Sequence, residues 1–133
     1  MVHVPIAVFE EVVQKGAGRP GSAEVAQARW VLRESVRDLA SVDRLCARLG
    51  RGESEAILLA RELVADLLVI DDSAARRVAE TEGQRVVGLV GLLIYAKQRG
   101  FVTEVKPLLD EMVASGFFLD EPRYQSILRR AGE

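Results

Sequence analysis

Apolar residues recur at helical spacing near the start of the chain, over residues 6–15. Pro5 precedes this pattern and Gly16 ends it. A proline is suited to the first turn of a helix because the missing N–H has no helical partner there. The pattern therefore predicts a short strand at 2–4, a helix at 6–15 and a loop at 16–22, where glycine and proline are concentrated.

The rest of the chain alternates between further strands and helices. The pattern predicts strands at 29–36, 67–70 and 85–87, and helices at about 22–28, 38–49, 53–64, 73–82, 88–100, 107–115 and from 121 onward. Residues 67–70 form an apolar run without polar alternation, which indicates a strand covered on both faces of a parallel sheet. Trp30 is expected in the core. The order predicts an α/β fold with a parallel sheet.

Length and composition suggest one domain without a membrane span. The chain has 133 residues, 49% of them hydrophobic, and a net charge of -2, which gives no global reason for nucleic-acid binding. Any polyanion would have to be held by a local patch or through metal ions. Cys46 is the only cysteine, so an intramolecular disulfide is excluded. No signal peptide and no apolar run of the roughly 20 residues needed for a span is found, and a cytoplasmic location is expected.

Acidic residues are the main candidates for chemistry. The only histidine, His3, lies at the amino terminus, which argues against a histidine triad or a His-rich zinc site. A P-loop is also absent. The remaining candidates are Glu10 or Glu11, Glu53 or Glu55, and Asp71 with Asp72. Carboxylates that converge at strand ends would suit Mg²⁺ or Mn²⁺, whereas helix capping and ordinary surface charge would explain the same residues without a ligand.

Four segments resemble the PIN domain, and in particular a prokaryotic PIN-like subfamily related to the ribonuclease toxins of toxin–antitoxin pairs. They are VPIAVFEEV, LGRGESEAILLARE, DLLVIDDSAARRVAE and VVGLVGLLIYAKQRG. The resemblance implies one PIN-like domain over residues 1–133, with a three-layer α/β/α arrangement around a parallel sheet. It also implies cleavage of single-stranded RNA with Mg²⁺ or Mn²⁺ held by about four acidic residues. Toxin members are inhibited by a partner antitoxin.

The family's acidic positions match this chain with two ambiguities. Glu11 matches the acid in the helix after the proline. A gapless count back from the strand favours Glu53 as the second acid, whereas the match of EAILLA favours Glu55. Residues two apart on a helix do not share a face, so only one of this pair is expected to serve the site. The acid that ends the strand is Asp71 or Asp72.

The amino terminus differs from the family pattern. Family members begin with a strand that ends in an Asp, before the point that matches residue 2 here. The expectation is a domain truncated at its amino terminus, with the first strand absent and the exposed sheet edge covered by homo-oligomerisation or strand exchange. Two functions follow: a toxin-type metal-dependent ribonuclease, or an inactive PIN remnant that serves as an oligomerisation or protein-binding module. Arg76 and Arg77 could contact RNA phosphate in the first, although a solvated or ion-paired role is favoured for both.

Overall fold

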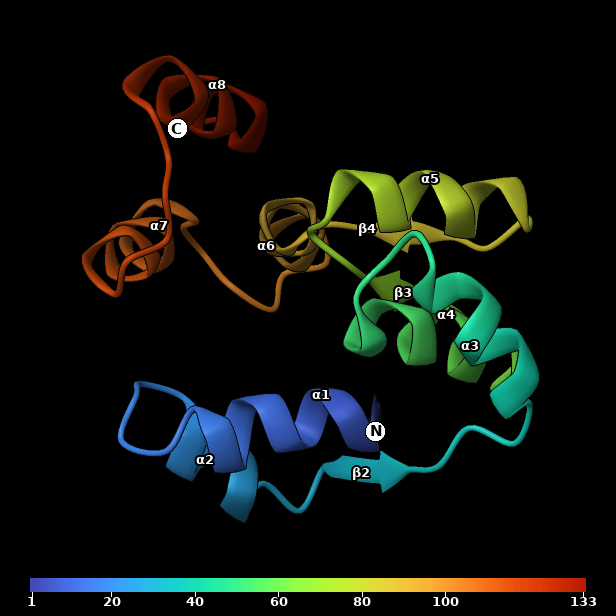
Figure 1. Ribbon diagram of the computed structural model, residues 1–133. Coiled ribbons are helices and arrows are strands. Elements are labelled where there is room, and N and C mark those ends of the chain that lie inside the picture. Colours follow the sequence, from blue (N-terminus) through green and yellow to red (C-terminus); the bar gives the residue numbers. More distant parts are fainter. The chain divides into compact units, whose positions relative to one another are not determined.

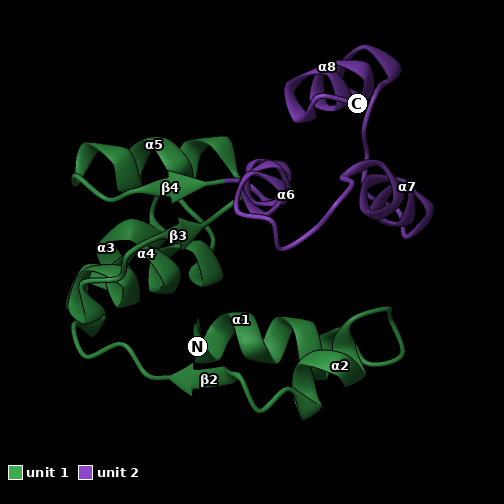
Figure 2. Ribbon diagram, turned by 180° about the vertical axis from the view of Figure 1, so that it is seen from behind, with its two compact units in different colours: residues 1–87 green, residues 88–133 purple.

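The computed structural model describes residues 1–133 in two compact units, residues 1–87 and residues 88–133 (Figures 1 and 2). The first unit contains β1 (Val2–Pro5), α1 (Ile6–Phe9), η1 (Glu10–Lys15), α2 (Ser22–Gln27), β2 (Val31–Glu34), α3 (Leu39–Cys46), α4 (Arg51–Leu63), β3 (Leu68–Val69), α5 (Ser73–Thr81) and β4 (Val86–Val87). The second contains α6 (Leu89–Gln98), α7 (Lys106–Ala114) and α8 (Glu121–Ala131). The predicted order and the α/β class are confirmed, and β2, β3 and β4 are shorter than predicted.

The four strands are parallel, as predicted, but they form two sheets of two strands. β1 pairs with β2, with Val2 opposite Val31, and β3 pairs with β4, with Leu68 opposite Val86. α1 lies over the first sheet and α5 runs along the second in both views (Figures 1 and 2). The first unit therefore contains two separate two-stranded sheets. Helix α4 contacts both of them, through β1 and β3.

Helix α4 is the centre of the first unit. Its residues Ile57, Leu58 and Leu59 are buried, and the helix contacts α1, α3, α5, β1 and β3. The buried core around it consists of Val36, Val42, Ile57, Leu58, Leu59, Leu68, Ile70, Ala75 and Ala79. Cys46 packs against the edge of this core, as expected for a small apolar side chain. Burial along α4 is what fixes the position of the acidic residues in its first turns.

Two residues that the sequence predicts to be buried, Val69 and Trp30, are exposed, so these two predictions are wrong. Val69 is 45% exposed, although its neighbours Leu68 and Ile70 are buried. Successive side chains of a strand point to opposite faces, so Leu68 and Ile70 share the covered face and Val69 lies on the other one. Trp30 is 59% exposed because it lies in the turn before β2 rather than inside the strand.

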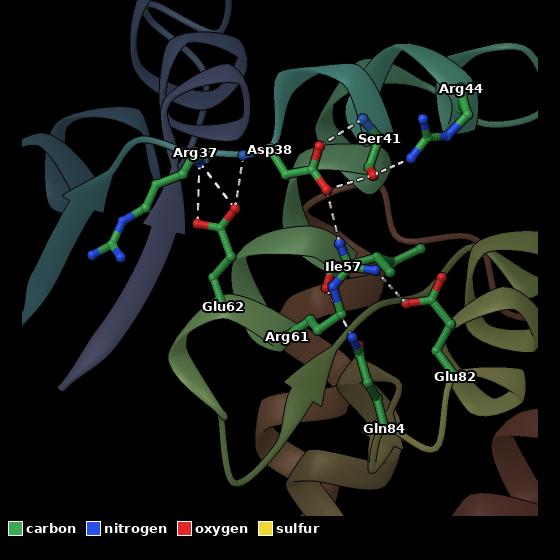
Figure 3. Close-up of polar contacts among 9 residues, drawn as sticks. All are labelled: Arg37, Asp38, Ser41, Arg44, Ile57, Arg61, Glu62, Glu82 and Gln84. Atoms are coloured by element: carbon green, nitrogen blue, oxygen red, sulfur yellow. Dashed lines mark hydrogen bonds and ion pairs between the residues drawn. The ribbon is translucent and has the colours of Figure 1, made fainter.

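A polar network attaches the β2–α3 connection to α4 (Figure 3). The Glu62 carboxylate accepts hydrogen bonds from the backbone N–H groups of Arg37 at 3.0 Å and Asp38 at 3.0 Å. Asp38 caps α3 by accepting from the Ser41 N–H at 3.0 Å and forms an ion pair with Arg61 at 3.2 Å. Hydrogen bonds from Ser41 are the main reason that the pKa of Asp38 lies below its usual value.

The second unit has a helical core of its own, formed by Ile94, Val105, Leu109, Ile127 and Leu128. Asp120 caps α8 by accepting from the Arg123 N–H at 2.8 Å. No helix in the chain has the length and apolarity that a membrane crossing would require.

Candidate functional site

A groove of about 740 Å³ runs through the first unit. Strand β1 lines one wall, β3 lines another, and the helices α1 and α4 contribute side chains between them. The α4 surface inside the groove is mostly apolar, formed by Ala56, Leu59, Ala60 and Leu63. Four acidic residues proposed from the sequence also line it, which are Glu11, Glu53, Asp71 and Asp72.

The fifth candidate, Glu55, does not line this groove. Its side chain is buried, and its Oε2 accepts a hydrogen bond from the backbone N–H of Ala7 at 3.1 Å. Its Oε1 accepts from Arg51 Nε at 2.7 Å. Pro5 leaves the first turn of α1 without a side-chain cap, so Glu55 supplies a partner for that turn from a distant helix. Glu53 is therefore the member of the Glu53/Glu55 pair that faces the groove.

The two aspartates after β3 have different surroundings. Asp72 is the N-cap of α5, and its Oδ1 accepts from the Ala75 N–H at 2.8 Å. Asp71 is exposed and precedes the cap. Arg76 holds the same chain segment through its Nη2, which donates to the carbonyl oxygens of Ile70 at 3.2 Å and Asp71 at 3.4 Å. Arg76 is thus occupied in fixing the end of β3, whereas Arg77 on the next position of α5 is exposed.

Glu11 lies in η1, a π-helical continuation of α1. Single π-helical turns are often found at functional sites because the inserted residue changes the direction of nearby side chains. The Glu11 carboxylate lies against the first turn of α4, where a Cβ added to Gly52 would be 3.3 Å from Glu11 Oε2. This contact brings an acidic residue from the start of the chain to the acidic turn of α4.

Open backbone edges also face the groove. Leu68 and Ile70 donate their N–H groups to the β4 side, at 2.8 and 2.9 Å, and Val2 donates to the β2 side at 2.9 Å. In a strand, successive N–H groups point to opposite edges. The backbone groups of His3 and Val69 therefore point away from β2 and β4, and both residues line the groove.

Sequence reasoning missed two features of the groove. Asp66 also lines it, but it precedes β3 and lies about five residues, or roughly 16 Å of extended chain, before Asp71. The second feature is the pair Gly50 and Gly52, each of which lies against an acidic side chain. The two glycines close to Glu53 in the sequence were the available signal of a crowded site. The sequence could not show that Glu11, from a distant segment, lies against Gly52.

The acidic residues of the groove have the right chemistry for a hard divalent cation, since all their donor atoms are carboxylate oxygens. No three His, Cys, Asp or Glu residues come together as a group that could hold a metal ion. Mg²⁺ commonly uses one or two protein carboxylates and completes its shell with water and substrate phosphate. The donors therefore fit an open Mg²⁺ or Mn²⁺ site of that type, and they do not form a closed cage of protein ligands.

Comparison with known proteins gives one family. A family model described as PIN domain matches residues 1–133, which is the whole chain. Neither the curated proteins nor the solved structures gave a match. Proteins of the matching family have nuclease-type function and generally use divalent metal ions. The match agrees with the parallel α/β elements and the acidic groove, and the chain belongs to the PIN-domain family.

Proposed function

We propose that this chain is a toxin-type endoribonuclease that cuts single-stranded RNA and depends on Mg²⁺ or Mn²⁺. The observation that carries the proposal is that Glu11, Glu53, Asp71 and Asp72 line one groove although they come from three separate segments. In this proposal a cytoplasmic antitoxin protein is the partner that inhibits the enzyme. Membership of a nuclease family supports the reaction class.

The acidic residues would divide the work of phosphodiester hydrolysis. One or two of the carboxylates of Glu11, Glu53 and Asp71 would hold the cation, with water and substrate phosphate completing its shell. Asp72 keeps one oxygen in the α5 cap and offers the other. When bound, the ion supplies charge stabilisation for the phosphate and activates a water for attack. A carboxylate oxygen that does not hold the ion can accept the proton of that water as the bond to the leaving oxygen breaks.

Exposed charge on α5 would help to bind the substrate. Arg77 lies in α5, after Asp71 and Asp72, and is exposed, so its guanidinium can contact a phosphate of the RNA. Arg76 is engaged by the carbonyl oxygens at the end of β3 and would act by holding that segment.

The test is cleavage of a labelled single-stranded RNA with and without Mn²⁺, using the full chain. The double variant Asp71→Asn, Asp72→Asn should lose at least about 100-fold of the Mn²⁺-dependent rate, since removal of groups that hold a catalytic metal is costly. Glu10→Gln is the matched control, because Glu10 neighbours Glu11 but does not line the groove. It should keep the wild-type rate. Equal cleavage by the wild type and the double variant would refute the assignment.

A second candidate is an oligomerisation or protein-binding module, and the open backbone edges favour it. His3 and Val69 direct backbone groups into the groove, beside the exposed apolar side chains of Met1, Val64 and Val69. Unpaired strand edges next to apolar surface pair readily with another extended segment. In this proposal the groove binds such a segment from a second copy of the chain, and the product is a homo-oligomer.

Light scattering over a range of protein concentrations tests this second function. The wild type should be at least a dimer, and Val69→Lys should shift it toward the monomer because a charge is placed on the groove face. Val113→Lys is the control, since Val113 is 39% exposed, belongs to the second unit and does not line the groove. A wild type that is monomeric at every concentration contradicts the module.

A further inference from the structure

We propose that Gly50 and Gly52 are positioning residues, whose missing side chains leave the space in which the carboxylates of Glu53 and Glu11 lie. The proposal rests on the proposed nuclease function and adds to it the two residues that arrange its acidic groups. The sequence LGRGE then has a reason for both glycines that differs from turn formation.

Gly50 makes room for Glu53. A Cβ built on Gly50 would come 2.3 Å from Glu53 Oε2, which is far closer than carbon and oxygen atoms approach. Gly50 is the N-cap of α4 and has φ −64° and ψ 162°, a backbone conformation that any residue adopts. The backbone gives no reason for a glycine there. A side chain at this position would instead displace the flexible end of Glu53, because the clash involves only the Glu53 carboxylate and leaves the α4 backbone in place.

Gly52 makes room for Glu11. A Cβ there would lie 3.1 Å from Val8 Cγ2 and 3.3 Å from Glu11 Oε2. Gly52 is buried in the first turn of α4, where alanine would be the better helix former by about 1 kcal/mol. The close approach of α1 and η1 to α4 explains the glycine. The missing side chains of Gly50 and Gly52 together leave room for the Glu53 and Glu11 carboxylates where they line the groove.

The variants Gly50→Ala, Gly50→Ser and Gly52→Ala separate positioning from helix stability. Serine is a preferred N-cap and alanine is not, so Gly50→Ser should be more stable to urea than Gly50→Ala. Both add a Cβ, so both should displace Glu53 equally. A purely structural role of Gly50 would make the serine variant behave as the wild type at the site.

The first readout needs no metal. Carboxyl-carbon NMR of the metal-free full chain should show the Glu53 signal shifted in both Gly50 variants, and the Glu11 signal shifted in Gly52→Ala. The second readout is Mn²⁺ affinity, measured from free Mn²⁺ by electron paramagnetic resonance. Each variant should bind Mn²⁺ about 10-fold more weakly than the wild type, which is the usual effect of misplacing a metal ligand.

The outcomes distinguish this proposal from the function on which it rests. Unshifted carboxyl signals, or shifted signals with wild-type Mn²⁺ affinity, would overturn the positioning role. Shifted signals in a protein whose wild type binds no Mn²⁺ would instead overturn the metal-dependent nuclease and leave the steric relation between glycines and acidic residues standing.

Discussion

Glu55→Ala tests whether the buried carboxylate of α4 is a structural group rather than a metal ligand. The substitution removes the acceptor of the Ala7 N–H, which is partly buried and bonded at 3.1 Å. A donor left without a partner inside a protein costs about 1–3 kcal/mol. The ion pair with Arg51 adds little, because the Arg51 side chain is 49% exposed and its charge is well solvated.

The expected loss can be read from urea denaturation at neutral pH. With about 2 kcal/mol lost and a urea dependence of about 2 kcal/mol per molar, the midpoint should fall by about 1 M. Glu55→Gln should lose much less, because the amide keeps an oxygen acceptor for Ala7. Glu53→Gln, at the groove, should leave the midpoint near that of the wild type.

Mn²⁺ affinity completes this test. Glu55→Gln should bind Mn²⁺ as the wild type does, whereas Glu53→Gln should bind it more weakly. If Glu55→Ala kept full stability and Glu55→Gln lost Mn²⁺ binding, the assignment of Glu55 to the fold and of Glu53 to the groove would be refuted.

Three further predictions concern stability. Ile57→Ala, in the fully buried centre of α4, should destabilise the chain by about 2–5 kcal/mol in urea, and a loss below about 1 kcal/mol would mean that this core is not packed as described. Val64→Gly should stabilise the chain by about 1 kcal/mol, because Val64 ends α4 at φ 51°, where a β-branched residue is strained; an unchanged midpoint would contradict that strain. Lys97 at 2.7 Å and the N–H groups of residues 105 and 106 lower the pKa of Glu133 to about 2 from 4.5. Folding favours the ionised form of Glu133, so the stabilisation it provides is present above pH 4.5 and is lost as the pH falls toward 2. Acid titration followed by circular dichroism should therefore show that Glu133→Gln loses less stability over that range than the wild type does.

Local sequence patterns determined the order and type of the elements. Helical spacing over residues 6–15, the cap residues Asp38 and Asp120, and the apolar run before Asp71 each act within a few residues of the chain. Interactions of that range can be read without tertiary information, since periodicity and capping depend on neighbours along the chain. The candidate acidic residues were also found in this way, because their positions follow from the elements that carry them.

Only the tertiary structure decided which acidic residues share the groove. Spacing left Glu53 and Glu55 equivalent, and the distinction came from Ala7, 48 positions away, whose N–H is bonded to Glu55. Val69 is exposed because packing covers only the opposite face of β3, on which Leu68 and Ile70 lie, and no local pattern reveals which face is covered. Likewise, the space beside Gly52 is explained by Glu11, on a different helix. A sequence states which groups a segment carries, whereas packing between distant segments determines which of those groups meet.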